Sequence, residues 1–498
     1  MAFFLSLSPV LFIFVLVVFL KMDVFRLAVV SFLYTAAVAF FFFSTSLKVL
    51  ALASLDGILT TLQLLLVVYT GILISHFLLD KGSLQRLTAT FSQGIQGGFR
   101  KALLLSAGFG NFFEGAGVIA EPVVAPMLYS AGISPTGSAV LSILGYAGLM
   151  HLALAGVIVT VLANVTALPA QDLALYLAAL SLPAILFLYL AIPFFIGELR
   201  ALKRYVPLIF SVSLVITLFA YLTVRFVGFS LSAMVGGVAG ILFLFLVYRA
   251  RVSITKESFK DVVPFLFLFL CLASVNLASP VRTLFARDLT FQVRVIPIDA
   301  ITFRPLADAY LYLFAAFLIA YHLFARSGDR VGDYVVTAFQ KAVRPLASMA
   351  LFGAMGSIIS FSGFKGDFSV LVESCNMAHC LAQGLIHSTG PFYPLFAPVL
   401  GWMGTFLTGY GVASIMLFGK LQIATADMLG VSRTLLATSL TVGASIGSIS
   451  SPFKIALASP LCNAVGREGE ILRRSIPIGI AVSFLVGLCS YGMKYLLR

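Results

Sequence analysis

The chain has 498 residues, of which 61% are hydrophobic and 10% are charged, and its formal net charge is +13. A soluble domain carries about 25% charged residues, so this composition excludes a soluble protein and predicts an integral membrane protein. The positive charge does not indicate a nucleic-acid partner, because basic residues flank membrane helices at the cytoplasmic face and the sequence has no separate basic domain. No phosphate loop, zinc-protease motif or Gly-x-Ser-x-Gly elbow occurs in a supporting context, so we expect neither an enzyme nor a bound cofactor.

The N-terminal segment 1–23 has no basic n-region and no small-residue cleavage signal, so it is interpreted as a retained first helix rather than a signal peptide. Further along, several uncharged stretches are long enough to cross a bilayer, which takes about 20 residues per helix. Barrel strands would instead alternate in polarity over about 10 residues. The predicted fold is therefore an all-α polytopic membrane protein, with crossings that include 57–79, 173–197, 205–224, 226–248, 262–281, 309–325 and 475–493.

Clusters of Lys and Arg predict the topology, because such clusters favour the cytoplasmic side. Placing all of them in the cytoplasm gives about twelve transmembrane helices. The loop 281–305 then falls outside although it carries four arginines, a cost that longer loops tolerate. The clusters are at 21–26, 81–101, 200–204, 249–260, 326–344 and 467–474.

An even number of crossings is required between Lys101 and Arg200, yet three apolar blocks lie there. The block 102–130 is interrupted by Gly, Glu and Pro, so it is predicted to enter the membrane and return as a re-entrant helical hairpin. The block 391–428 has the same character and is placed on the opposite side. The segments 81–101 and 363–390 are interpreted as interfacial helices that precede the two hairpins.

The two hairpin blocks share a glycine-rich phrase, GNFFEGAGV at 110–118 and GTFLTGYGV at 404–412. A second pair follows in the same order, AGISPTGSA at 131–139 and LGVSRTLLA at 429–437. Opposite sides of entry make this an inverted-topology repeat, a common plan of secondary transporters. The predicted units are N-terminal scaffold helices, repeat 1, middle scaffold helices and repeat 2. The N-terminal scaffold helices are at 1–80 and the middle scaffold helices at 206–344. Repeat 1 is at 81–205, with hairpin 102–130 and broken helix 138–166. Repeat 2 is at 345–498, with hairpin 391–428 and broken helix 434–466.

Non-helical backbone at membrane depth survives only where protein or a water-filled cavity satisfies it, and the N-termini of half-helices favour anions. In repeat 2, TVGASIGSISSPFK at 441–454 adds hydroxyl donors and one lysine, a set that suits a small carboxylate. Alternatively, the glycines only pack helices and the lysine reaches the interface. The predicted substrate-binding residues are Asn111, Gly115, Gly117, Thr405, Thr408, Gly409, Gly411, Ser414, Ser445, Ser448, Ser450, Ser451 and Lys454.

Three titratable side chains are predicted to couple transport to protons: Glu114, Glu121 and His151. A charge in mid-membrane costs roughly 2.5–3.5 kcal/mol, and burial disfavours the charged form of a carboxyl group, so a carboxylate there can carry a proton. The alternatives are a hairpin tip that reaches water and a histidine that is only hydrogen-bonded. A second cluster, with cysteines at 375 and 380 and histidines at 379 and 387, has helical spacing, but nothing completes a metal site there and none is predicted.

These phrases resemble the L-lactate permease family, which includes glycolate permeases. GWMGTFLTG at 401–409 is similar to the family's Gly-Trp-x-Gly-Thr-Phe-Leu-Thr-Gly, and LFGKLQIATADMLGVS at 417–432 and VGREGEILR at 465–473 continue the match. Glu114-Gly115-Ala116 followed by Pro122 fits the family's Glu-Gly-Ala segment.

The departures from the family pattern fall at positions expected to face the ligand. The family's Gly-Phe-Gly-Thr is here Val118-Ile119-Ala120-Glu121, its Asn-Thr-Ala-Pro near 146–149 reads YAGL, and its polar tip after the second Thr-Gly begins with Tyr410. The resemblance implies a proton-coupled symporter of small 2-hydroxy monocarboxylates, of the lactate or glycolate type, in the cell membrane. Because of the departures, a different organic or inorganic anion, or sodium coupling, stays an alternative.

The expected partners are a small organic anion, a proton and membrane lipid. A homodimer is expected only by analogy with other folds that have paired hairpins.

Overall fold

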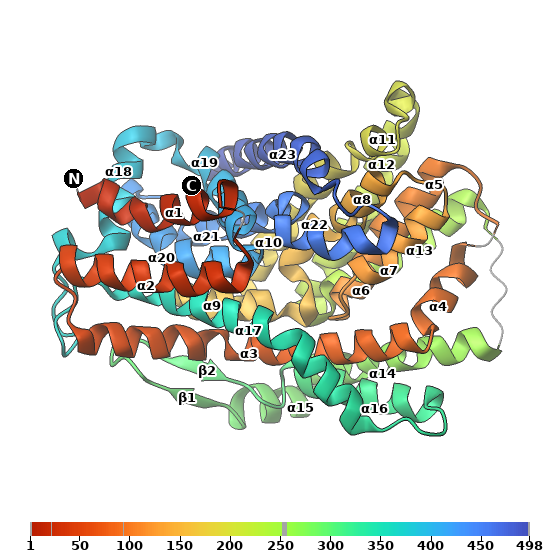
Figure 1. The fold of residues 1–498 in the computed structure, drawn as a ribbon, viewed down its shortest axis with the longest axis horizontal. Helices are drawn as coiled ribbons and strands as arrows, with labels where there is room; N and C mark the ends of the chain where they lie inside the picture. Colours follow the sequence, from red (N-terminus) through yellow and green to blue (C-terminus); the bar gives the residue numbers. More distant parts are fainter. Residues whose placement is uncertain (1, 21, 93, 251–255, 497–498) are drawn as a thin grey trace.

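The computed structural model describes residues 2–20, 22–92, 94–250 and 256–496, and these form a predominantly helical molecule (Figure 1). Within these ranges, 9 helices are long and apolar enough to cross a membrane. They agree with the predicted crossings at six of the seven stretches, and the seventh, 309–325, forms the shorter apolar helix α16 (Ala309–Phe324). The nine are Val24–Phe42, Leu47–Asp80, Ala170–Phe195, Leu199–Phe226, Phe229–Tyr248, Ser258–Leu277, Val331–Phe361, Gly411–Leu429 and Glu468–Met493.

Two long helices, α3 (Leu47–Asp80) and α17 (Val331–Phe361), pack along each other through much of their length (Figure 1). Glycine allows the close crossing, because a Cβ on Gly57 would lie 2.2 Å from the carbonyl oxygen of Gly353. The crossing predicted to begin at 345 begins earlier, since α17 runs without interruption through the basic segment and through Pro345. The predicted border between 344 and 345 therefore falls inside a helix.

The first glycine phrase lies at the bend of a helical hairpin. One arm consists of α5 (Gly98–Leu103), a π-helical turn at Leu104–Phe109 and α6 (Gly110–Gly115), and the other arm is α7 (Glu121–Ser130). Next comes α8 (Pro135–Ala147), which is separated from α9 (Val157–Thr166) by two 3-10 turns, Met150–Leu152 and Leu154–Gly156. The helix predicted at 138–166 is thus broken near its middle.

The second glycine phrase has the same surroundings. Helix α19 (Tyr393–Thr408) ends at Gly409, whose φ of +85° lies in the left-handed region that glycine adopts freely, and α20 (Gly411–Leu429) begins two residues later. Helix α21 (Arg433–Ile446) is then separated from α22 (Pro452–Ala458) by a 3-10 turn at Gly447–Ser450. Hairpin and broken helix therefore follow one another in both halves of the chain.

The remaining elements surround these units. The segment 281–305, predicted as a loop, contains a two-stranded antiparallel ribbon in which Phe291 pairs with Phe303, so the fold is not entirely α-helical. The ring centroids of these two residues are 5.3 Å apart and stacked, which stabilises the ribbon. The elements are α1 (Ala2–Val18), α2 (Val24–Phe42), α4 (Ser83–Ser92), α10 (Ala170–Tyr189), α11 (Ile192–Phe195), α12 (Leu202–Phe226), α13 (Ser232–Tyr248), α14 (Lys256–Leu277), α15 (Ser279–Thr283), β1 (Phe291–Val293), β2 (Ile301–Phe303), α18 (Met377–Thr389) and α23 (Glu468–Leu496).

Candidate functional site

A cavity of about 90 Å³ lies where both hairpin bends and both helix breaks meet, and we call it the central cavity. Most of its lining is apolar, and its charged groups are two carboxylates and one ammonium. The segments that form it are far apart in the sequence, and they bring the two glycine phrases together in space. The lining residues are Leu64, Val68, Glu114, Ile119, Glu121, Met150, Leu154, Ile158, Met349, Tyr410, Gly411, Val412, Phe453, Lys454 and Leu457.

Four buried side chains form a charged cluster at this cavity: Glu114, Glu121, Tyr146 and Lys454. The ammonium of Lys454 donates to the Tyr146 hydroxyl at 2.6 Å, and that hydroxyl donates to Oε1 of Glu121 at 2.6 Å. The same ammonium lies 3.3 Å from Oε1 of Glu121 and 3.8 Å from Oε1 of Glu114. The cluster therefore joins the first hairpin and α8 to α22 through one cation and two anions.

Local structure places each member of the cluster. Glu114 stands near the end of α6 and accepts a hydrogen bond from the backbone N–H of Ala120 across the bend, at 3.1 Å. Glu121 is the first residue of α7, where the helix dipole stabilises a negative charge. Lys454 stands in the first turn of α22, next to the N-cap Ser451. The helix breaks thus bring the charged side chains to the cavity.

The N-terminus of α20 also faces the central cavity, because Tyr410, Gly411 and Val412 line it. The first N–H groups of a helix have no partner within that helix, and the N-cap residue Tyr410 supplies no side-chain capping bond. The Tyr410 hydroxyl is buried and has no hydrogen-bond partner in the part of the chain that the structure describes. These groups can bind an anion or a hydroxyl group.

Several predicted ligand residues instead make contacts within the protein. The amide of Asn111 donates to the carbonyl oxygens of Ala107 and Gly145 and to the Tyr189 hydroxyl, which fastens the first hairpin to α8 and α10. Gly115 allows close packing on α13, because a Cβ there would lie 2.3 Å from the backbone nitrogen of Met234.

Gly117 has a φ of +80° at the bend, and its carbonyl oxygen lies 2.2 Å from where a Cβ on Gly71 of α3 would be. Together, these contacts give Asn111, Gly115 and Gly117 structural roles.

The predicted hydroxyl donors are mostly engaged within the protein as well. Hydroxyl groups in helices commonly bond the carbonyl four residues earlier, and others here bond neighbouring backbone or a thioether. Thr405 Oγ1 is the exception: it is buried and without a partner among the described residues. The bonds are Thr408 to the Gly404 carbonyl, Ser414 to the Gly401 carbonyl, Ser445 to the Thr441 carbonyl, Ser448 to Met150 Sδ, Ser450 to the Ser475 carbonyl, and the Lys454 N–H to Ser451 Oγ.

His151 lies outside the charged cluster. Its Nε2 contacts the Ser181 hydroxyl at 2.8 Å and the Leu177 carbonyl at 3.2 Å, both on α10. The ring is fully buried, and its Nδ1 has no partner within the described ranges. This geometry agrees with the hydrogen-bonded alternative more closely than with a relay to the carboxylates.

Residues 2–20, 22–92, 94–250 and 256–496 contain no group of three or more His, Cys, Asp and Glu side chains that could hold a metal ion. In the cysteine–histidine segment, Cys380 Sγ donates to the Ser374 carbonyl at 3.4 Å, and His379 pairs with Glu373 at 3.4 Å.

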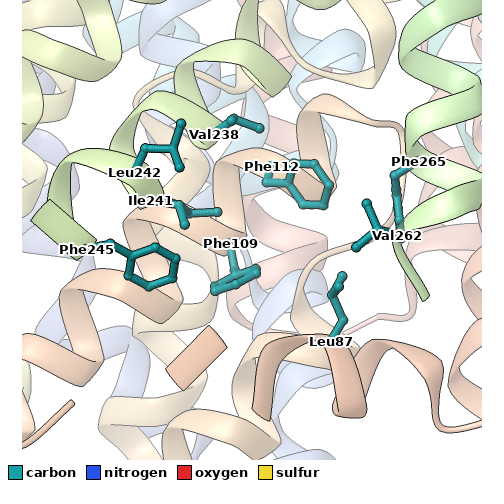
Figure 2. Close-up of a pocket in the computed structure, with 9 residues that line it drawn as sticks. All are labelled: Leu87, Phe109, Phe112, Val238, Ile241, Leu242, Phe245, Val262 and Phe265. Carbon is teal, nitrogen blue, oxygen red and sulfur yellow. The ribbon is translucent and has the colours of Figure 1, made fainter. Parts of the chain in front are cut away.

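A second hollow, of about 220 Å³, lies between the first hairpin, α4, α13 and α14. Figure 2 shows the side chains around it, and every one is apolar, including Phe109, Phe112 and Phe265. Leu242, which also lines it, is 61% exposed at the molecular surface, where lipid acyl chains would lie. This hollow offers no hydrogen bond to a small anion, so the central cavity is the candidate site.

Two members of the site, Tyr146 and Tyr410, are not among the residues predicted from the sequence. Both lie where the chain departs from the family pattern, one in YAGL and the other directly after the second Thr-Gly. Glu121 is a third departure from the family pattern and lies in the same cluster as Tyr146. Departure from the family pattern is therefore the feature of the sequence that points to these site residues.

Known proteins with sequences similar to this chain are permeases. The family model described as L-lactate permease matches residues 2–264 and 283–497. The glycolate permease GlcA of Escherichia coli (strain K12) is 29% identical over 201 residues, which are 40% of this chain and 33% of that protein. The L-lactate permease of the same strain is 25% identical over 450 residues, 79% of this chain and 78% of that protein. The L-lactate permease of Bacillus subtilis (strain 168) is 32% identical over 124 residues, 25% of this chain and 22% of that protein. The family model matches this chain over nearly its whole length, which shows that the chain belongs to the L-lactate permease family. Together with the apolar helices, this match shows that it is a multi-pass transport protein of the cell membrane.

Proposed function

We propose that this protein is a secondary transporter that carries a small 2-hydroxy monocarboxylate, of the lactate or glycolate type, together with a proton. The observation that carries the proposal is the charged cluster of two carboxylates and one ammonium at the central cavity. Relatives named as L-lactate and glycolate permeases support the substrate class.

Charge balance supports the proton. With both carboxylates ionised, Glu114, Glu121 and Lys454 together carry one net negative charge, and a substrate carboxylate would add a second. Unbalanced charge inside a membrane is expensive. One proton on the cluster restores the original charge, and a proton and an anion then cross together.

Glu114 is the carboxylate that we assign to the proton. Glu121 is stabilised as an anion by two close partners, the Tyr146 hydroxyl at 2.6 Å and the Lys454 ammonium at 3.3 Å. Glu114 has one backbone hydrogen bond, and its distance of 3.8 Å to the same ammonium is longer than a hydrogen bond. Neutralising Glu114 therefore sacrifices less interaction energy, and it leaves Lys454 more available to a substrate.

The substrate carboxylate is placed between Lys454 and the N-terminus of α20, which present an ammonium and free N–H groups to the same cavity. The Tyr410 hydroxyl, without a protein partner in the described chain, is available to the substrate's 2-hydroxyl group. Met150, Leu154 and Ile158 would contact the short carbon chain.

The architecture that we propose has two inverted repeats and about twelve crossings, with the hairpins re-entrant from opposite faces of the membrane. Because α3 and α17 contact each other extensively, they are the natural scaffold. The hairpins and broken helices would move relative to it to expose the central cavity to each side in turn.

The direct test is uptake of labelled lactate and glycolate into proteoliposomes, with and without an imposed inward proton gradient. We expect the gradient to drive accumulation above equilibrium and the external medium to become more alkaline as substrate enters. Uptake that is independent of pH and moves no protons would refute proton coupling. Failure of both lactate and glycolate to enter would refute the proposed substrate class.

A second candidate is the same architecture with another anion or with sodium as the coupling ion. Glu121, Tyr146 and Tyr410 all depart from the family pattern and all lie at the site, which favours a changed ligand. Competition by a panel of organic and inorganic anions, run in sodium and in potassium buffers, separates the candidates: lactate outcompeted by another anion, or uptake that requires sodium, would favour the second.

A further inference from the structure

A second polar cavity, of about 200 Å³, lies at the end of the molecule where the α12–α13 turn, the end of α14 and the start of α16 meet. We call it the outer cavity, because the predicted topology places the ends of these helices on the non-cytoplasmic side. Its charged lining residues are Arg282, Arg304 and Asp308. It is separate from the central cavity, and no residue lines both.

The charges of the outer cavity are only partly compensated by the protein, since Arg304 attracts the Asp308 carboxylate without forming a close ion pair with it. Neither guanidinium forms an ion pair within the ranges 2–20, 22–92, 94–250 and 256–496, whereas other cations in the molecule do, such as Lys420 with Asp299 at 2.7 Å. Asp308 Oδ2 is buried, and it too has no hydrogen-bond partner in those ranges. With two cations and one anion, the cavity has an excess positive charge that can attract a small anion.

The same two arginines belong to the loop that disagrees with the positive-inside rule. Basic residues outside the membrane oppose the positive-inside preference, at a cost that a loop of this length tolerates. Arg282 and Arg294 of this loop are both exposed and Arg304 is half-buried, but Arg282 and Arg304 line the cavity and Arg294 does not. A binding role explains why these two positions carry positive charge on that side.

Neighbouring residues of the break between α8 and α9 line the two cavities. Leu154 lines the central cavity and the next residue, Ala155, lines the outer one. Both have positive φ, 51° and 50°, a conformation that side-chain-bearing residues adopt at a cost. This strained break therefore contributes lining to both cavities.

We propose that the outer cavity is a second binding site for small carboxylates, in which Arg282 and Arg304 capture the anion before it passes the Leu154–Ala155 segment to the central cavity. The proposal rests on the proposed transport of a monocarboxylate. The ligand would be held by charge-assisted hydrogen bonds from the guanidinium groups.

The test uses opposite changes of charge. Arg304→Gln and Arg282→Gln should each raise the KM for lactate presented from outside by about tenfold and leave the KM for exit from the inside unchanged. Asp308→Asn should lower the outside KM by about threefold, because it removes a like charge. A gain in affinity cannot come from misfolding, and Asp308 makes no capping hydrogen bond that the substitution would break. Arg294→Gln is the matched control and should change neither KM.

An unchanged outside KM in Arg304→Gln and in Asp308→Asn would overturn the outer site even if the wild type transports lactate. If the wild type takes up no lactate, the proposed transport fails. Equilibrium dialysis of labelled lactate against the purified protein then decides the outer cavity alone. Lactate binding that weakens in Arg304→Gln and strengthens in Asp308→Asn supports the outer site. Lactate binding that is unchanged in both variants refutes the outer site. If anionic lipid occupies the two arginines instead, the KM for lactate presented from outside would change with the phosphatidylglycerol content of the liposomes. That result would also refute the proposal.

Discussion

Tyr146→Phe removes a single oxygen atom that connects the two halves of the charged cluster. That oxygen accepts from Lys454 at 2.6 Å and donates to Glu121 at 2.6 Å. A hydrogen bond to a charged group contributes about 1.5–3 kcal/mol. Glu121 keeps Lys454 at 3.3 Å, so we count one such loss rather than two. We therefore expect kcat/KM for lactate uptake to fall by roughly 10-fold to 100-fold, since about 1.4 kcal/mol corresponds to a factor of ten.

The matched control is Tyr189→Phe, which deletes the same atom from another fully buried tyrosine. The Tyr189 hydroxyl donates to the Gly145 carbonyl at 2.8 Å and accepts from the Asn111 amide at 3.0 Å, so its partners are neutral. This variant should lose about 0.5–1.5 kcal/mol of stability and keep its kcat/KM and its response to pH. Both are measured by initial uptake into proteoliposomes alongside thermal unfolding. Equal effects of the two variants on uptake would show that Tyr146 serves packing only.

Three further outcomes are expected. Glu114→Gln should retain exchange of lactate across liposomes that are preloaded with it and lose accumulation driven by a proton gradient, whereas Glu121→Gln should impair both; the reverse pattern would move the proton to Glu121. In the wild type, initial uptake should rise as the external pH is lowered, because the proton is a co-substrate, and a flat profile between neutral and mildly acidic pH would contradict coupling. Gly57→Ala should destabilise the protein by about 1–3 kcal/mol, because the added Cβ would lie 2.2 Å from the Gly353 carbonyl oxygen. Gly332→Ala, which adds a Cβ in open space on α17, should not destabilise the protein. Thermal unfolding of the two variants in detergent tests this difference.

The sequence alone was informative about where helices break. Glycine-rich phrases and prolines interrupt apolar blocks, and these are local features that short-range backbone preferences determine. The bends after Gly115 and at Gly409, and the break before Lys454, all fall within the blocks predicted to contain them. The start of α17 was missed, because a charged segment and Pro345 resemble the end of a loop although the helix continues through them.

Side-chain direction could not be predicted in the same way. Serine and threonine in a helix can face a cavity or bond their own backbone, and composition does not distinguish the two. The sequence predicts Ser445 as a ligand because of its hydroxyl group, yet that hydroxyl donates to the Thr441 carbonyl at 3.1 Å. Tyr146 and Lys454 are 308 residues apart, so their contact depends on how the two repeats pack. A single sequence contains no signal for such a pair.

The departures from the family pattern form one physical unit. Where the resemblance leads to threonine and asparagine, this chain has Glu121 and Tyr146. A glutamate introduced alone at membrane depth would be a buried, unpaired charge, which is strongly destabilising. Here Lys454 and the Tyr146 hydroxyl both contact its Oε1, so the added charge is compensated by the neighbouring residues. Glu121 and Lys454 line the central cavity and Tyr146 hydrogen-bonds to both, so a change in one of the three alters the charge that a substrate meets. Glu121 and Tyr146 therefore have to be exchanged together in any attempt to give this site the family's residues at these two positions.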